Sequence, residues 1–336
     1  MPDKKHRIKK KKKKPSFYKD MTPALVLPLA MAVHLYSYRA LLLCAVSVLS
    51  AVVFDIIGCR ITNQKIMIKD FSSIYIGALL SLMLPASAPL WLPVLGSAFA
   101  VLIIKVPFGG VKSAPFSCVA AAFSFLSICR PAMMFAYPTV NSDASTAVFG
   151  SDGFIAGTSV AHLLSQENPP AITAVDIINA AIGTVPGPMG MTSAVIMAGI
   201  LVYLLVKRPK SFINSVSFLL TCLVGAVISV AVKTGRLFCE SSLRLIFMYL
   251  CSGLTLCIAV FLITEESLSP KKTSHRIFYG ITAGIIYMIL RRISVFEDAG
   301  CFAVLTANFI WPLAEKYIFN GTLFKRNKKA EVTSVE

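Results

Sequence analysis

Long apolar runs constrain the fold of this chain more than any other feature of its sequence. Ten segments of 17–21 residues consist almost wholly of apolar side chains, at about residues 21–37, 39–59, 71–88, 90–106, 116–136, 190–206, 212–232, 243–263, 276–293 and 299–319. A helix of about 20 residues crosses the hydrocarbon core of a bilayer. The runs are continuous and do not alternate, which argues against a membrane β-barrel. The sequence therefore predicts an all-α, polytopic membrane protein with about ten transmembrane helices.

Composition excludes an ordinary soluble domain. Hydrophobic residues make up 56% of the chain, charged residues only 15%, and the mean hydropathy is +0.73. One globular core cannot bury that much apolar surface, so most of it must face lipid.

The placement of lysine and arginine predicts the orientation in the membrane. With ten crossings and a cytoplasmic N-terminus, most loop cations fall on the cytoplasmic side, Lys207, Arg208 and Lys210 among them. Cytoplasmic loops carry such an excess. The predicted parts are a cytoplasmic tail (1–20), a transmembrane domain (21–319), a cytoplasmic C-terminal tail (320–336) and, within the domain, an outer or re-entrant segment (about 137–189).

The net charge of +17 is concentrated in the N-terminal run Lys4–Lys14. Such runs bind nucleic acid in some proteins. Ahead of an apolar segment they are more typical of a cytoplasmic tail that contacts anionic lipid. No cleavage site for a removable signal peptide follows. We therefore expect a multi-pass protein of the cell membrane whose tail contacts lipid and not nucleic acid.

Glycine and proline interrupt the apolar pattern at two corresponding places. Gly109-Gly110 precedes Pro115, and Gly187-x-x-Gly190 precedes the run at 190–206. Paired breaks in the two halves of a membrane protein indicate an inverted repeat with broken helices.

Two polar stretches have both a functional and a structural interpretation. Gly187–Ser193 opens a helix, where free amide groups favour an anion, although a tight turn with a Thr or Ser cap fits equally. Glu265 and Glu266 leave a helix on the inner side, as a solvated helix end or as a polar lining next to a cofactor or ion path. The local sequence alone predicts solvated charge.

Metal ligands are not indicated. The nine cysteines form no C-x-x-C pair and lie mostly within apolar runs, and the four histidines are scattered. Small buried side chains are the usual role of such cysteines.

The segment Ser151–Val160 is irregular and combines an acid, two glycines and adjacent hydroxyls among apolar runs. A Gly turn with a Ser or Thr cap would account for it, and so would a binding site.

Five further motifs follow one another in the order found in one family of membrane subunits. They are an Asp-x-Ser helix start ending in Pro (Asp70, Ser72, Pro85), Phe-Gly-Gly (Phe108–Gly110), Gly-x-x-Gly-x-Thr-Ser (Gly187–Ser193), a segment from Phe to Ser-Pro before an aromatic-Gly turn (Phe261–Pro270, Tyr279-Gly280) and Gly-x-Phe-Ala-x-Leu-x-x-Asn (Gly300–Asn308). Over residues 21–319 the chain resembles the D subunit of the Rnf complex and the related B subunit of the sodium-pumping NADH:quinone reductase.

This resemblance implies a covalently bound FMN. The family attaches FMN by a phosphoester to the Thr of Asp-x-x-Ser-Gly-Ala-Thr. Counting from Asp152 places Thr158 at the acceptor position, and counting from Gly157 places Ser159 there. The spacing from the acid and the usual identity of the acceptor favour Thr158.

Four other residues are candidates for contact with such a flavin. Gly187, Gly190 and Thr192 would contact the flavin or its phosphate from a helix N-terminus, and Arg130 would supply a counter-charge at the outer face. Met191 replaces a family Glu, a departure that bears on ion transport more than on flavin binding.

The implied function is that of a membrane subunit in a multi-subunit electron-transport complex, relaying electrons through FMN and coupled to Na⁺ or H⁺ translocation. The chain would not be a complete enzyme, because no NADH site or cluster motif is visible. Its expected partners are the other subunits of an Rnf-like complex and a flavin transferase. A second, non-covalent flavin leaves no readable motif.

Two other functions stay open at this point. A secondary transporter with broken helices would use the same Gly/Pro breaks and need no cofactor. A scaffold subunit of such a complex, without its flavin, would keep the fold alone.

Overall fold

The computed structural model describes residues 16–63, 70–139, 159–165, 172–234, 240–293 and 299–319, and this part of the chain is helical without a strand. The elements are α1 (Phe17–Met21), η1 (Pro23–Leu25), α2 (Val26–Ile61), α3 (Ser72–Met83), α4 (Trp91–Ala98), η3 (Phe99–Lys105), α5 (Cys118–Cys129), α6 (Pro131–Met134), α7 (Val160–Ser165), α8 (Ala174–Ile182), α9 (Ala194–Lys207), α10 (Pro209–Thr234), α11 (Glu240–Cys251), α12 (Thr255–Cys257), η4 (Ile258–Leu262), α13 (Thr273–Ile293), α14 (Gly300–Ala314) and η5 (Glu315–Phe319). The predicted all-α class is confirmed, and each predicted apolar segment contains helix.

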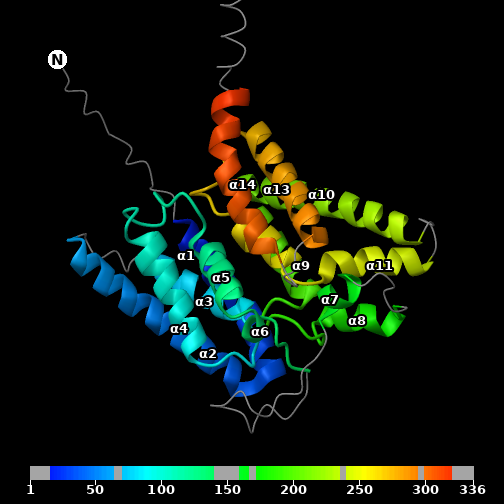
Figure 1. Ribbon diagram of the computed structural model, residues 1–336, viewed down its shortest axis with the longest axis horizontal. Coiled ribbons are helices and arrows are strands. Elements are labelled where there is room, and N and C mark those ends of the chain that lie inside the picture. The colour runs from blue at the N-terminus through cyan, green and yellow to red at the C-terminus, as the bar shows by residue number, and fades with distance from the viewer. Residues whose placement is uncertain are drawn as a thin grey trace, which may run out of the picture.

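The helices form two groups in chain order (Figure 1). Helices α2–α5, in blue to blue-green, lie on one side, and α9–α14, in green to red, lie on the other. One hydrophobic core joins the groups and includes Leu79 of α3, Phe123 of α5, Phe261 of η4 and Tyr279 of α13. The inverted repeat stays a prediction.

Helix α2 contains the junction between the first two predicted spans. Its 36 residues would extend about 54 Å if straight, well beyond a ~30 Å hydrocarbon core. Ser37 interrupts it with φ 53° and ψ −146°, a conformation outside the helical region. The break therefore falls where the segment 21–37 was predicted to end.

In the described part of the chain, fewer than ten helices are long and apolar enough to cross a membrane alone. Among the described residues, two stretches are long and apolar enough to cross alone, Phe17–Ile61 and Pro209–Lys233. A third forms if Glu240–Cys251 and Thr255–Leu262, bent by 57°, count as one span. The other apolar helices are shorter, Ser72–Met83, Trp91–Lys105, Cys118–Cys129 and Ala194–Lys207 among them. Ten crossings are thus not confirmed.

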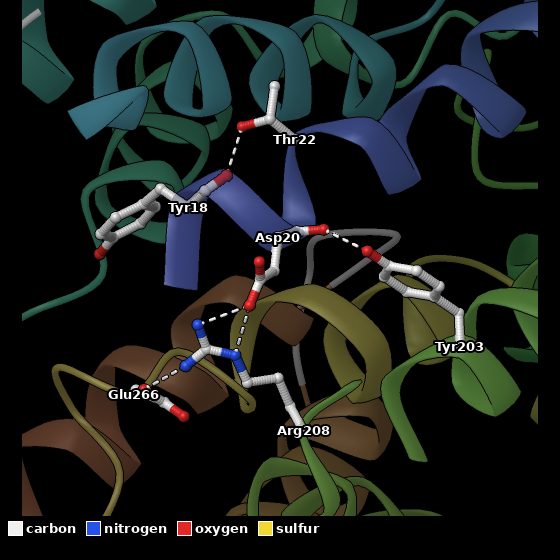
Figure 2. Close-up of polar contacts among 6 residues, drawn as sticks. All are labelled: Tyr18, Asp20, Thr22, Tyr203, Arg208 and Glu266. Carbon is white, nitrogen blue, oxygen red and sulfur yellow. Dashed lines mark hydrogen bonds and ion pairs between the residues drawn. The ribbon is translucent and has the colours of Figure 1, made fainter. Parts of the chain in front are cut away.

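The N-terminal helix α1 joins the two groups (Figure 2). Arg208, between α9 and α10, contacts the carboxylate of Asp20 at 2.7 Å and that of Glu266 at 2.7 Å. Tyr203 donates to the backbone carbonyl of Asp20 at 2.9 Å. The boundary of the basic tail predicted at residue 20 therefore falls inside a packed helix.

Of the two acids predicted to be solvated, Glu266 is exposed and Glu265 is not. Glu265 is 5% exposed and accepts a hydrogen bond from the Tyr18 hydroxyl at 2.5 Å. Glu266 pairs with Arg208. Local sequence could not show this, because both partners come from segments distant in the chain.

Candidate functional site

The predicted attachment segment is described only at its end. Asp152, Gly157 and Thr158 lie outside the described residues, and Ser159 is the first residue described after them. Ser159 is 5% exposed, and its carbonyl accepts from the Leu163 amide at 3.1 Å, which begins α7. The alternative acceptor is therefore placed in a buried position beside the favoured one.

Ser159 lies in the wall of a narrow cleft built from four separate segments. The lining residues are Tyr137, Ser159, Val160, Val185, Pro186, Gly187, Pro188, Thr192, Cys251, Ser252 and Gly253. Its free volume is about 20 Å³, enough for a water molecule. The cleft brings Ser159 to two of the predicted contacts, Gly187 and Thr192.

The wall of the cleft formed by residues 183–193 is held by glycine conformation and hydroxyl bonds. Gly183 ends α8 with φ 103°, and a Cβ there would lie 2.9 Å from the Ser193 Cβ. The Thr192 hydroxyl donates to the Gly183 carbonyl at 2.9 Å, and Ser193 caps α9 by accepting from the Ile196 amide. This matches the tight turn with a Thr or Ser cap that the sequence left open.

Gly190 lies outside the cleft lining and has a packing role. Its amide donates to the Leu82 carbonyl at 3.1 Å, and the Met189 amide donates to that of Leu84 at 3.1 Å. A Cβ on Gly190 would lie 2.4 Å from Leu82 Cδ2. The loop amides at these two positions thus complete the last turn of α3.

Arg130 also lies outside the cleft lining. It is exposed and stands between α5 and α6, where its carbonyl accepts from the amides of Met133 and Met134. The cleft residue nearest to Arg130 in the sequence is Tyr137.

The structure instead places Arg291 against the cleft wall. Its guanidinium donates to the hydroxyl of Ser252, a lining residue, and to the Tyr249 carbonyl at 2.9 Å. It also lies over the Tyr249 and Tyr287 rings, 5.1 and 5.9 Å from their centroids. Arg291 was not predicted as a site residue. The available signal was the Arg291-Arg292 pair at the end of the predicted span 276–293.

A larger cavity of about 400 Å³ adjoins the cleft and shares Val160, Val185 and Pro186 with it. Its other lining residues are mainly apolar, with Asp176, Asn179 and Thr184 as the polar ones. Asp176 and Thr173 form a reciprocal capping box at the start of α8. A volume of this size is typical of a small-molecule site.

Metal binding has no support among the residues that the structure describes. No group of three or more His, Cys, Asp or Glu side chains there is arranged to share an ion.

Comparison with known proteins gives one consistent result. A sequence profile of the NQR2, RnfD, RnfE family matches residues 4–323. The chain is 28% identical over 328 residues to the D subunit of the Na⁺-translocating ferredoxin:NAD⁺ oxidoreductase complex of Acetobacterium woodii, covering 96% of each chain. It is 25% identical over 312 residues to the D subunit of the ion-translocating oxidoreductase complex of Salmonella dublin, covering 84% of this chain and 86% of that one.

Proposed function

Because the chain belongs to the NQR2, RnfD, RnfE family, we propose that it is the membrane subunit of an Rnf-like electron-transport complex and carries covalent FMN on Thr158. Ser159 is the alternative acceptor. The bound flavin relays electrons between the neighbouring subunits of the complex.

The observation that carries the proposal is the burial of Ser159 in the cleft wall. Ser159, the alternative acceptor, lies in a cleft that Gly187, Thr192 and Ser252 also line. Thr158, the favoured acceptor, precedes Ser159 in the sequence and lies outside the described residues.

The residues of the cleft fit the polar end of FMN. Ser159, Thr192 and Ser252 bring hydroxyls to the lining, Gly187 brings backbone without a side chain, and Arg291 lies behind Ser252. A phosphoester is anionic, and a nearby guanidinium stabilises it. The cleft itself is too small for a flavin ring, but the adjoining cavity of about 400 Å³ offers apolar walls for one.

Bound FMN would supply the electron-transfer chemistry, and the protein would supply position and potential. The Arg291 guanidinium, which donates to Ser252, would supply positive potential at the cleft and favour electron uptake. Val160 and Val185 line both the cleft and the cavity and would shield a bound ring from water. Thr192 is fixed by Gly183 and keeps the wall in place.

The membrane arrangement forms part of the same proposal. The lysine and arginine distribution supports cytoplasmic termini and an outer site between residues 137 and 189. Its partners are the other subunits of the complex, a flavin transferase and membrane lipid. Electron relay is coupled to translocation of Na⁺ or H⁺.

Flavin attachment can be tested directly. The full-length chain, co-expressed with a flavin transferase, is denatured, separated on a gel and inspected for flavin fluorescence. We expect a fluorescent band that Thr158→Ala abolishes and Ser159→Ala retains. Thr184→Ala, which removes another hydroxyl near the same site, is the matched control and should stay fluorescent. A dark wild-type band, with the transferase active on another substrate, contradicts the proposal.

A further inference from the structure

A second, larger cavity of about 500 Å³ lies at the C-terminal end of α2. It shares no lining residue with the cleft at Ser159. Its wall includes two acids and two lysines and consists of Tyr18, Asp55, Cys59, Asp70, Ser72, Lys105, Val106, Gly109, Gly110, Val111, Lys112 and Ser113.

Two opposite charges are paired in the wall of this cavity. The Lys105 ammonium lies 2.9 Å from Asp55 Oδ1, and the two side chains are 9% and 3% exposed. Lys105 also donates to the Ser73 hydroxyl at 2.6 Å. Ser73 in turn donates to Asp55 Oδ2 at 2.7 Å. The ammonium is thus held by one carboxylate oxygen and one hydroxyl oxygen.

Close packing of α2 against α3 places Asp55 and Ser73 together. A Cβ on Gly77 would lie 2.7 Å from the Val48 Cα, and the Ser47 hydroxyl donates to the Gly77 carbonyl at 2.7 Å. Ser73 precedes Gly77 by one helical turn and Asp55 follows Ser47 by two, so each shares a face with its contact residue. The close approach of the α2 and α3 backbones therefore fixes the positions of the Asp55 and Ser73 side chains.

Lys105, which contacts both Asp55 and Ser73, is positioned by a second packing contact of α2. A Cβ on Gly58 would lie 2.5 Å from Val106 Cγ2, so α2 and the end of η3 pack without space between them. The Lys105 carbonyl accepts from the Gly110 amide at 2.9 Å. Gly110 has φ 112°, and no atom lies within 4 Å of its Cβ position. The loop that follows Lys105 thus borders open space in the cavity.

A buried carboxylate in this position needs a cation beside it, because an uncompensated buried charge is strongly destabilising. Carboxylate and hydroxyl oxygens are the ligands of hard cations. Lysine supplies a compact point charge at the end of a flexible stem. The cavity offers room for a hydrated ion and for a withdrawn ammonium.

We propose that Asp55 and Ser73 form a site for a small monovalent cation and that the ammonium of Lys105 occupies it as a tethered cation. Ser73 keeps its donation to Asp55 and offers a lone pair to whichever cation is present. A free ion enters from the cavity only when Lys105 leaves the site. This proposal is independent of the flavin at Thr158, because the two sites share no residue.

The test removes the tethered charge and asks whether a free cation replaces it. Thermal unfolding midpoints of the full-length chain in detergent are compared in NaCl, KCl and choline chloride at equal ionic strength. We expect Lys105→Met to be less stable than wild type in choline and to regain several degrees in Na⁺ or K⁺, because ligand binding stabilises the folded state. The wild-type midpoint should not depend on the cation.

Two controls separate the site from a general salt effect. Lys112→Met makes the same change at the other lysine that lines the cavity and should show no dependence on the cation. The double variant Asp55→Asn/Lys105→Met lacks the carboxylate, so its unfolding midpoint should no longer depend on the cation. Lys105→Gln is measured as well, in case Lys105→Met does not fold. Equal unfolding midpoints for the Lys105 variants in all three salts would overturn the proposal. A wild-type midpoint that depends on Na⁺, with this dependence lost in Asp55→Asn, would also overturn it.

Discussion

Arg208 and Asp20 form a two-point contact in which Nε and Nη2 of the guanidinium donate to the same carboxylate oxygen at 2.9 and 2.7 Å (Figure 2). The Nη1 of Arg208 contacts Glu266 at 2.7 Å. One side chain between α9 and α10 therefore links the N-terminal helix to the segment that follows η4.

Loss of this link should destabilise the packing of α1. Hydrogen bonds to charged groups contribute about 1.5–3 kcal/mol, less where the pair is partly exposed. We expect Arg208→Ala to lower the free energy of unfolding by about 1–2 kcal/mol. Thermal unfolding in detergent measures it, with Lys210→Ala, an exposed neighbour, as control. Equal midpoints for the two variants would show that the link contributes nothing.

Gly190→Ala should destabilise the chain by overpacking. The added methyl would lie 2.4 Å from Leu82 Cδ2 in the buried turn against α3. Overpacking costs about 1–3 kcal/mol. Gly199→Ala is the matched control, because nothing lies within 4 Å of that Cβ position. An alanine inside a helix is favoured over glycine by about 1 kcal/mol, so the two variants should shift the midpoint in opposite directions.

Arg291→Gln should lower the midpoint potential of the bound flavin. The guanidinium is a positive charge behind Ser252 in the cleft wall. Positive potential stabilises the reduced cofactor, so its loss makes reduction harder by tens of millivolts as an order of magnitude. Arg292→Gln changes the neighbouring, exposed arginine and should leave the potential within a few millivolts. A redox titration followed by the flavin absorbance measures the midpoint potential of both variants.

The start of α8 should loosen in acid. Hydrogen bonds from the Thr173 hydroxyl and amide hold the pKa of Asp176 below its usual range. This stabilisation is present above the ordinary pKa of Asp and is lost as the pH falls through the lowered value. Hydrogen exchange of α8, corrected for the intrinsic rate, should therefore rise below about pH 4. Asp176→Asn should remove the pH dependence, and an unchanged profile in that variant would contradict this explanation.

Helix positions could be predicted from apolar runs because lipid and core demand the same side chains along the whole segment. The predicted span 276–293 lies within α13, Thr273–Ile293, and the break at Ser37 falls at the last residue of the predicted span 21–37. Helix α1 was missed because Phe17 and Tyr18 follow a basic run and make too short a pattern to register.

The pairings across the chain could not be predicted. Asp55 and Lys105 are 50 residues apart, and Arg291 reaches Ser252 across 39 residues. Each pair depends on helix packing that a single sequence does not encode locally. The Gly187–Ser193 turn is intermediate, since its motif was visible but the partner of its amides, the end of α3, was not.

The mass of the chain after co-expression with a flavin transferase tests the central claim most directly. We predict an intact mass raised by that of FMN less one water, with the modification on the chymotryptic peptide that follows Phe154 and fragment ions that assign it to Thr158. An unmodified mass, or a modified peptide that contains neither Thr158 nor Ser159, would contradict the account.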